Sequence, residues 1–155
     1  NKNLYKDAGD YIVMIVAGPN ARKDYHYNET EELFYQLEGN IEVHIQEDGK
    51  KRTMKLGPGD MYLHPAKVPH SPVRKEGSIG LVIERKRASM NVDDGLLWFC
   101  DNCNHKLYEA YFTLHDIEKD FLAHFKHFYS SKELRTCDNC GTVMPVDERF
   151  IAKEE

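Results

Sequence analysis

Between residues 10 and 90, short apolar runs alternate with turn residues at intervals of about ten positions. Several runs are β-branched or alternate apolar with polar side chains, as strands with one buried face do. The runs are 11–16, 33–37, 41–45, 52–56, 61–63 and 79–84. Turn signals such as Asp48-Gly49 separate them. This spacing predicts a β-sandwich or a barrel, whose inward-facing side chains can line a ligand pocket.

The composition changes after the last of these runs. Residues 89–95 read as a linker, and the part that follows carries all the cysteines. Residues 116–129 show helical periodicity, with Asp116 as the N-cap. The apolar face of this helix is formed by Ile117, Phe121, Phe125 and Phe128. We therefore expect a barrel over 1–90 and an extension over 91–155 that contains one helix and packs on the barrel.

The chain has 155 residues, of which 41% are hydrophobic, and its formal net charge is −5. This size and composition allow a buried core and exclude a disordered chain. The acidic balance, without a Lys/Arg run, argues against a nucleic-acid partner. The longest apolar stretch, 11–17, is far shorter than the ~20 residues that a bilayer needs. With no signal-peptide pattern at the start, we expect a cytoplasmic protein without a membrane partner.

The cysteines occur in two copies of one tetrapeptide, Cys100-Asp-Asn-Cys103 and Cys137-Asp-Asn-Cys140, with 33 residues between them. Two Cys-x-x-Cys pairs in a chain without a secretory signal favour metal binding, with disulfides as the alternative. Four thiolates around one ion form a closed tetrahedron with no position for a substrate. We expect a structural Zn²⁺ or iron here, and the choice between the two metals stays open.

Two further stretches, 18–39 and 59–74, carry candidate catalytic chemistry. The second stretch matches the pattern of the cupin family, in which Gly59 is followed after five residues by Pro65 and after four more by His70. In the first stretch, Glu32 precedes Gly39 by six residues, as it does in cupins. The chain therefore resembles a cupin, and the resemblance implies a mainly β jelly-roll barrel that holds a metal ion.

The resemblance implies His26, Glu32 and His70 as the metal ligands, whereas Asp24 stands where many cupins have another histidine. Glu31 is the alternative to Glu32, but the spacing to the following glycine favours Glu32. Two histidines and one carboxylate on one side of a metal are typical of non-haem Fe(II) oxygenases, because open positions remain for a substrate and O₂.

Two arginines flank the candidate ligands. Arg22 comes four residues before His26, and Arg74 comes four residues after His70. Two guanidinium groups that converge on one pocket suit a carboxylate, because each can donate two hydrogen bonds to it. We expect Arg22 and Arg74 to bind the acidic group of a small substrate.

Glu84 is a candidate for a different reason, since it lies in an otherwise apolar strand. A carboxylate there is costly unless it is paired or contacts a ligand. The neighbouring Arg85, Lys86 and Arg87 are interpreted as exposed charges or ordinary ion pairs.

Four motifs make the resemblance more specific: Gly-Pro-Asn-x-Arg-x-Asp-Tyr-His at 18–26, Phe-Tyr-Gln at 34–36, Val-Pro-His-Ser-Pro-Val-Arg at 68–74 and Val-Ile-Glu-Arg at 82–85. Together they resemble the 3-hydroxyanthranilate 3,4-dioxygenase family over nearly the whole chain. The cysteine-rich tail is similar to that of its bacterial and fungal type, whose second site is rubredoxin-like. Members carry a further N-terminal segment, so residues are expected upstream of this sequence.

The resemblance implies an extradiol cleavage in which 3-hydroxyanthranilate and O₂ give 2-amino-3-carboxymuconate semialdehyde, the precursor of quinolinate and NAD. Fe(II) would be bound by His26, Glu32 and His70, with Glu32 also close to the substrate. Arg22, Arg74 and Glu84 would contact the substrate, and Asp24 would support a ligand or an arginine. The family also implies a homodimer.

Two other classes of function remain open at this stage. One is a cupin sensor whose tail acts as a zinc ribbon, although the acidic balance argues against contact with nucleic acid. The other is a Zn²⁺-dependent cupin isomerase of sugar phosphates. Arg22 and Arg74 could bind a phosphate, but Glu84 would repel it.

Overall fold

The computed structural model describes residues 1–7 and 9–151. The strands are β1 (Lys2–Asn3), β2 (Tyr11–Ala17), β3 (Tyr25–Tyr27), β4 (Glu32–Glu38), β5 (Ile41–Glu47), β6 (Lys50–Leu56), β7 (Met61–His64), β8 (His70–Arg74), β9 (Ile79–Arg85), β10 (Asp94–Phe99) and β11 (Lys106–Phe112). The α-helices are α1 (Ile117–Tyr129) and α2 (Lys132–Arg135), and the 3-10 helices are η1 (Ala88–Met90) and η2 (Glu148–Phe150).

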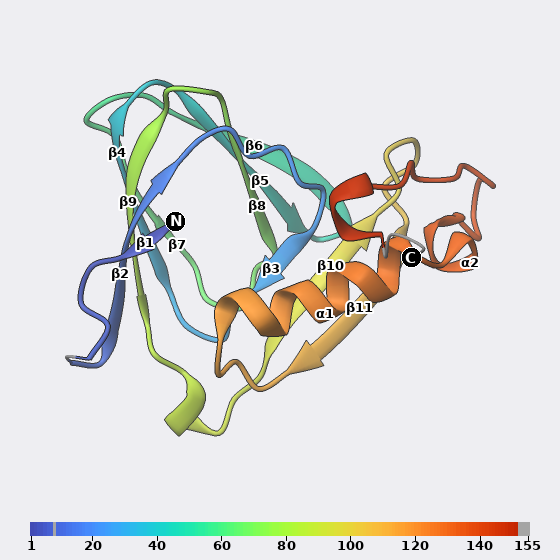
Figure 1. Ribbon diagram of the computed structural model, residues 1–155. Helices are drawn as coiled ribbons and strands as arrows, with labels where there is room; N and C mark the ends of the chain where they lie inside the picture. Colours follow the sequence, from blue (N-terminus) through green and yellow to red (C-terminus); the bar gives the residue numbers. More distant parts are fainter. Residues whose placement is uncertain (8, 152–155) are drawn as a thin grey trace.

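Two antiparallel sheets form a barrel, and α1 lies beside its open end (Figure 1). The strand order is β1-β2-β9-β4-β7 in one sheet and β11-β10-β3-β8-β5-β6 in the other. Asp48 and Gly49 join β5 to β6 with φ angles of +54° and +73°. Two successive positive φ angles are typical of a hairpin turn whose twist matches the strands. The predicted mainly β fold is confirmed.

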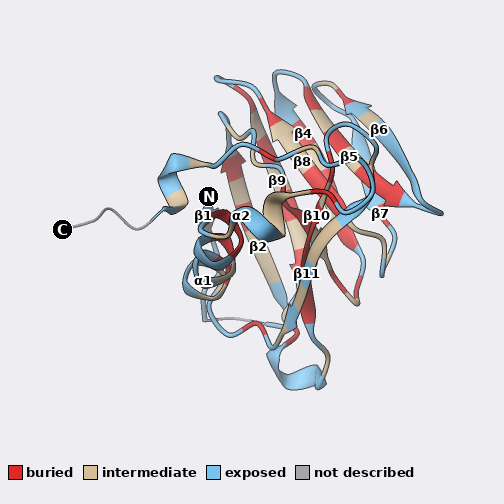
Figure 2. Cartoon of the chain, turned by 90° about the vertical axis from the view of Figure 1, so that its right-hand side faces the viewer, coloured by how far each residue is buried: buried red, intermediate tan, exposed pale blue. Residues whose placement is uncertain are grey.

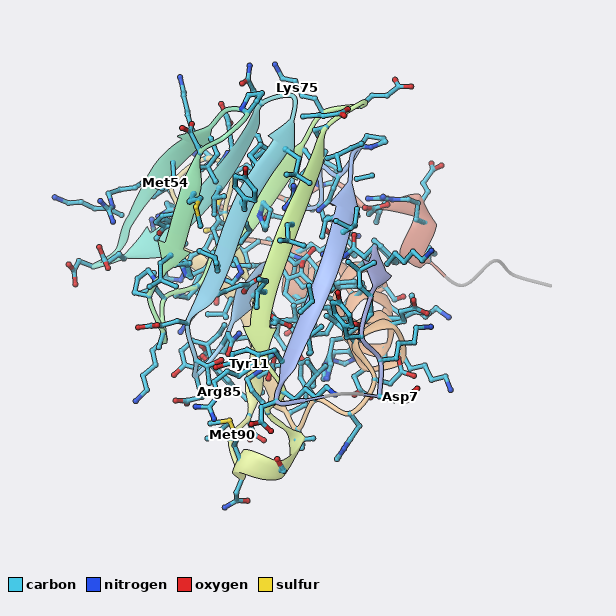
Figure 3. All side chains as sticks on the ribbon, turned by 90° about the vertical axis from the view of Figure 1, so that its left-hand side faces the viewer. Asp7, Tyr11, Met54, Lys75, Arg85 and Met90 are labelled. Carbon is cyan, nitrogen blue, oxygen red and sulfur yellow. The ribbon has the colours of Figure 1, made fainter. Side chains whose placement is uncertain are left out.

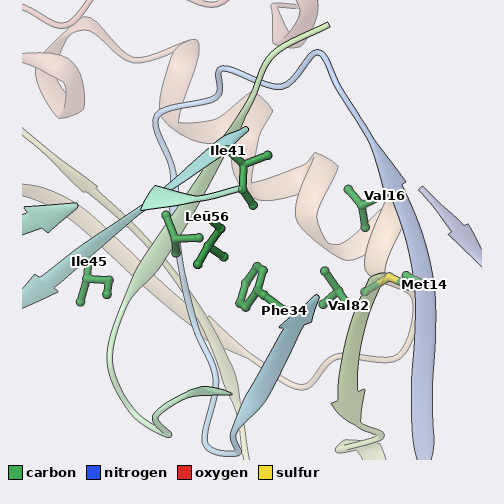
Figure 4. Close-up of a cluster of buried hydrophobic side chains, with 8 residues drawn as sticks. Met14, Val16, Phe34, Ile41, Ile45, Leu56 and Val82 are labelled. Carbon is green, nitrogen blue, oxygen red and sulfur yellow. The ribbon is translucent and has the colours of Figure 1, made fainter. Parts of the chain in front are cut away.

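The barrel core follows from the alternation of side chains along the strands. In β5, Ile41, Val43 and Ile45 are buried, while Glu42 and His44 between them are partly exposed. The buried residues pack with others from β2, β4, β6 and β9 (Figure 4). Each fully buried aliphatic side chain stabilises the fold by about 1.5–3 kcal/mol.

A second core lies between α1 and strands β10 and β11. Trp98 of β10 is fully buried and stacks on Phe128 of α1, with 4.3 Å between the ring centroids. Figure 2 shows buried residues running along β10 toward α1. As predicted, Asp116 caps the helix, because its side chain accepts hydrogen bonds from the backbone N–H groups of Glu118 and Lys119.

The junction between the two predicted parts differs from the sequence interpretation. Residues 89–95 are not simply a linker, because β10 begins at Asp94 and pairs with both β3 and β11. The division into 1–90 and 91–155 stays a prediction, and residues 152–155 lie outside the described part. Among the described residues, no helix is long and apolar enough to span a membrane.

The outward sides of the two sheets differ in polarity. On β5 and β6 this side is polar, with pairs such as Glu42 opposite Lys55. On the five-stranded sheet it is apolar, and Figure 3 looks onto it. One row across its strands is formed by Leu63, Leu33, Ile83 and Val13, and the next by Met61, Tyr35, Leu81 and Ile15. Met61 is 64% exposed and Leu63 is 56% exposed, so this apolar face is open.

Candidate active site

A pocket of about 600 Å³ lies between the barrel and α1. The residues that the sequence analysis assigned to a metal or a substrate line it together: Arg22, His26, Glu32, His70, Arg74 and Glu84. Asp24 is not part of the lining; it is buried beside Arg22, with 3.2 Å between its Oδ1 and the Nε of the arginine. The assigned roles stay predictions, but the fold brings these side chains to one place.

The strands explain why the three candidate ligands meet. His26 of β3 and His70 of β8 face each other as register partners, and Glu32 begins β4. One ligand atom from each of the three lies within 4.8 Å of the others. Glu31, the alternative carboxylate, is exposed to solvent.

One unsatisfied polar atom of this cluster, Oε2 of Glu32, is an atom that a metal ion held by the three residues would satisfy. Nε2 of His70 lies 2.9 Å from Oε2 of Glu32. Among the described residues, neither this oxygen nor Nδ1 of His70 has a hydrogen-bond partner, although both are buried. Buried polar atoms are normally hydrogen-bonded, so exceptions call for an explanation such as an absent ion. Two imidazoles and a carboxylate form a donor set that suits Fe(II).

The charge of the cluster also suits a cation. Burial by itself raises the pKa of Glu32, but the charge of the nearby His70 lowers this pKa to about 2. Glu32 is therefore ionised at neutral pH. A metal ion held by the three residues would take the place of the charged His70 imidazole as the positive partner of this enclosed carboxylate.

Arg74, at the end of β8, is 3% exposed. Its side chain makes one hydrogen bond among the described residues, a contact of 3.4 Å from Nη1 to Oε1 of Gln36. Burial lowers the pKa of Arg74 to about 10, although the charge of Glu32 acts in the opposite direction. At neutral pH this arginine is a buried cation with several N–H groups left for a ligand.

Arg22 differs from Arg74 in its exposure, since its side chain is 33% exposed. Besides its contact with Asp24, the guanidinium lies over the ring of Phe125, with 5.0 Å from Cζ to the ring centroid. Burial raises the pKa of Asp24, and the charge of Arg22 opposes this rise. The pair holds Arg22 at the edge of the pocket, between the barrel and α1.

Glu84 lies opposite Glu32 in the register of β9 and β4. Burial and then the negative charge of Glu32 raise the pKa of Glu84 well above its ordinary value. Its two oxygens each have one distant partner at 3.5 Å, Nδ2 of Asn28 and Nη2 of Arg87. Glu84 therefore retains hydrogen-bonding capacity toward the pocket.

Arg87 and Asp94 were not predicted from the sequence as site residues. Arg87, for which an exposed charge or an ordinary ion pair was expected, is in an ion pair, but it is only 2% exposed and donates two hydrogen bonds to Asp94. Asp94 also lies 2.6 Å from Nε2 of His26. Neither residue belongs to a recognisable motif, and Asp94 fell in the predicted linker. Only the pairing of β10 with β3 places it beside His26.

One apolar wall of the pocket was missed as well, because it comes from the C-terminal part of the chain, whereas Ile12, Met14, Phe34 and Val82 line the barrel side. The C-terminal wall is formed by Leu114, Ile117, Phe121, Leu122, Phe125 and Phe150. A helical apolar face predicts packing against a core, and periodicity alone does not separate a core from a pocket wall.

The four cysteines form the second candidate metal site, with one Sγ from each lying within 4.8 Å of the others. None is in a disulfide; the Sγ atoms of Cys100 and Cys140 are 3.6 Å apart, and those of Cys103 and Cys137 are 3.5 Å apart. Four sulfurs without an open position suit Zn²⁺ or a single iron.

The two copies of the tetrapeptide also support each other. Nδ2 of Asn102, in the first copy, donates to Sγ of Cys140 at 3.6 Å. Nδ2 of Asn139, in the second copy, donates to Sγ of Cys103 at 3.5 Å. Each asparagine thus contacts the last cysteine of the other copy, which explains why the same residue occurs at both positions.

An antiparallel β-barrel whose interior holds two histidines and a carboxylate defines this protein as a cupin with a candidate metal site. The chain belongs to the 3-hydroxyanthranilic acid dioxygenase family, whose model matches residues 1–129. A 3-hydroxyanthranilate 3,4-dioxygenase of Xanthomonas campestris pv. campestris is 54% identical over 154 residues, which span 99% of this chain and 86% of the relative. One of Bacillus thuringiensis is 44% identical over 148 residues, covering 95% of this chain and 82% of the relative.

Proposed function

We propose that this protein is a dioxygenase that cleaves the aromatic ring of 3-hydroxyanthranilate. The bond between ring carbons 3 and 4 breaks, and both atoms of O₂ enter the product, 2-amino-3-carboxymuconate semialdehyde. The observation that carries the proposal is the meeting of His26, Glu32 and His70 with Arg74 in one pocket. The family and its relatives, named for this reaction, support the same substrate.

His26, Glu32 and His70 would hold Fe(II), and Cys100, Cys103, Cys137 and Cys140 would hold a structural iron or Zn²⁺. Iron in the pocket supplies the redox chemistry that allows O₂ to react with an aromatic ring. The protein supplies the placement of the substrate, the local charge and the exclusion of water.

Arg74 binds the substrate carboxylate, because its buried guanidinium has N–H groups without protein partners. Arg22 closes the same end of the pocket, held in place by Asp24. Glu84 accepts a hydrogen bond from the amino or hydroxyl group of the substrate. Phe121 and Phe125 cover the ring and exclude water, which strengthens these polar contacts.

The test is O₂ uptake by protein reconstituted with Fe(II) and given 3-hydroxyanthranilate. We expect one O₂ consumed for each substrate, with a product that absorbs near-ultraviolet light. Anthranilate, which lacks the ring hydroxyl, is the control and is expected to give no uptake. Protein with a full complement of pocket iron and no uptake on 3-hydroxyanthranilate would contradict the proposal.

We also propose a cytoplasmic homodimer formed through the apolar outer face of the five-stranded sheet. The eight residues of the two rows on β7, β4, β9 and β2 include no charged side chain, and Lys2 of β1 ends the second row at the edge of the sheet, so the centre of the face can pack against a second copy of itself. Leu63→Lys should convert the dimer to a monomer in light scattering, while Thr53→Lys on the polar sheet should not. A parent protein that is monomeric at high concentration would contradict this proposal.

A further inference from the structure

The guanidinium of Arg87 is fixed by its surroundings. Nε and Nη2 donate to Oδ1 and Oδ2 of Asp94 at 2.7 and 2.6 Å. Nη1 donates to the backbone carbonyl of Arg85 at 2.7 Å. Each of the three nitrogens therefore has an acceptor, and the planar group is held in one orientation.

The buried ion pair of Arg87 and Asp94 contacts two residues that line the pocket. Oδ2 of Asp94, which is 0% exposed, lies 2.6 Å from Nε2 of His26. Nη2 of Arg87 lies 3.5 Å from Oε1 of Glu84. One buried cation is therefore shared between the partner of a candidate metal ligand and a candidate substrate-binding carboxyl group.

We propose that Arg87 is a positioning residue for the reaction, which fixes His26 through Asp94 and fixes Glu84 directly. This inference rests on the proposed function, because it takes His26 as a metal ligand and Glu84 as a substrate contact. A carboxylate on one imidazole nitrogen sets the tautomer and the direction of the ring, so that the other nitrogen is available to a metal.

A purely structural role makes a different prediction. Arg87 and Asp94 flank the segment 88–93, so their ion pair also closes this loop. If closing the loop were the whole role, substitutions would lower thermal stability and leave metal affinity and catalysis unchanged. Stability and metal affinity must therefore be measured on the same protein.

The decisive variant is Arg87→Lys, which keeps the positive charge but cannot make the planar two-point contact. Arg85→Lys is the matched control, because Arg85 is exposed and lies two positions away. The full chain, with Zn²⁺ in its cysteine cluster, is titrated with Fe(II) without O₂ and without substrate. We expect Arg87→Lys to weaken Fe(II) binding by about 10- to 100-fold, as the loss of a partner behind a metal ligand does, and the control to match the parent.

Asp94→Asn separates the two branches of the network. It removes the carboxylate that holds His26 and leaves Arg87 free to contact Glu84. Fe(II) binding should therefore weaken, while the KM for 3-hydroxyanthranilate stays near that of the parent protein. Arg87→Lys should weaken Fe(II) binding and also raise KM, measured at saturating Fe(II).

Parent-like Fe(II) affinity in both variants, whatever their melting temperatures, would overturn the proposal. Should Arg87→Lys fail to fold, Asp94→Asn decides alone, since a parent-like affinity refutes the proposal and a weakened one supports it. The titration needs no substrate. A parent protein that binds Fe(II) in the pocket but does not cleave 3-hydroxyanthranilate would therefore refute the proposed function and leave the affinity comparison valid.

Discussion

The two candidate metal sites of this chain differ in their donor atoms and in the residues around them. The site in the pocket has imidazole and carboxylate donors from strands β3, β4 and β8, surrounded by buried ionisable side chains such as Arg74 and Glu84. The cysteine site has four sulfurs from two loops and receives hydrogen bonds from neutral asparagine amides. Cys103 and Cys140 are exposed to solvent.

Because of this difference, we expect the pocket site to serve catalysis and the cysteine site to serve stability. Three donors on one side of a pocket leave coordination positions for other molecules, and the pocket provides the space for them. Four thiolates fill a tetrahedron and leave no such position. We therefore expect damage to the first site to abolish turnover, and damage to the second to weaken the fold of the C-terminal part.

The largest expected effect follows from removing a donor in the pocket. His26→Ala, Glu32→Ala and His70→Ala should each lose the pocket iron and all measurable turnover, because two remaining donors bind Fe(II) weakly. Iron content and O₂ uptake are measured with the cysteine site counted separately. A variant that keeps stoichiometric pocket iron and full activity would refute this assignment, and Glu31→Ala is the control, since Glu31 is exposed.

The next effect is on stability. Cys100→Ser with Cys103→Ser should lower the melting temperature strongly, because metal binding at a four-cysteine site contributes several kcal/mol of folding free energy. Turnover per pocket iron should stay near that of the parent in protein that still folds. A loss of a hundredfold or more, with the pocket iron still present, would show that the second metal acts in catalysis.

A smaller effect is expected for substrate recognition. Arg74→Ala should weaken binding of 3-hydroxyanthranilate by about 10- to 150-fold, corresponding to the ~1.5–3 kcal/mol of a hydrogen bond to a charged group. Fe(II) affinity should change much less. Substrate titration of the iron-loaded protein measures the first affinity and Fe(II) titration without substrate measures the second, and unchanged affinity for the substrate would mean that its carboxylate is bound elsewhere.

The smallest effect concerns the asparagines of the cysteine site. Asn102→Ala with Asn139→Ala should weaken Zn²⁺ binding by about tenfold, because two thiolates lose a hydrogen-bond donor from the other copy of the tetrapeptide. Asp138→Ala is the control, since Asp138 is exposed. Competition with a chromophoric chelator measures the affinity, and an unchanged value would mean that the amides do not support the metal site.

The sequence was most informative where spacing carries the chemistry. The candidate ligands and the cysteines occur at intervals that few other roles require, and the strand over 41–45 showed clear alternation. β3 spans only Tyr25–Tyr27, which is too short for a periodic signal. Arg87 and Asp94 could not be found from the sequence, because their importance depends on a contact between the end of β9 and the start of β10.

The position of α1 between the two cysteine pairs has a consequence for the order of assembly. Synthesis proceeds from the N-terminus, so the candidate ligands His26, Glu32 and His70 and the pocket residues Arg22, Arg74 and Glu84 are made before the first cysteine. The first pair alone cannot complete a tetrahedron, and the second pair follows 33 residues later, after α1. A metal bound by both pairs would therefore hold the two ends of segment 104–136, which carries α1 and most of the C-terminal residues that line the pocket. The candidate ligands of the pocket therefore precede this segment during synthesis, and the segment can be held at both ends only after the second cysteine pair has been made.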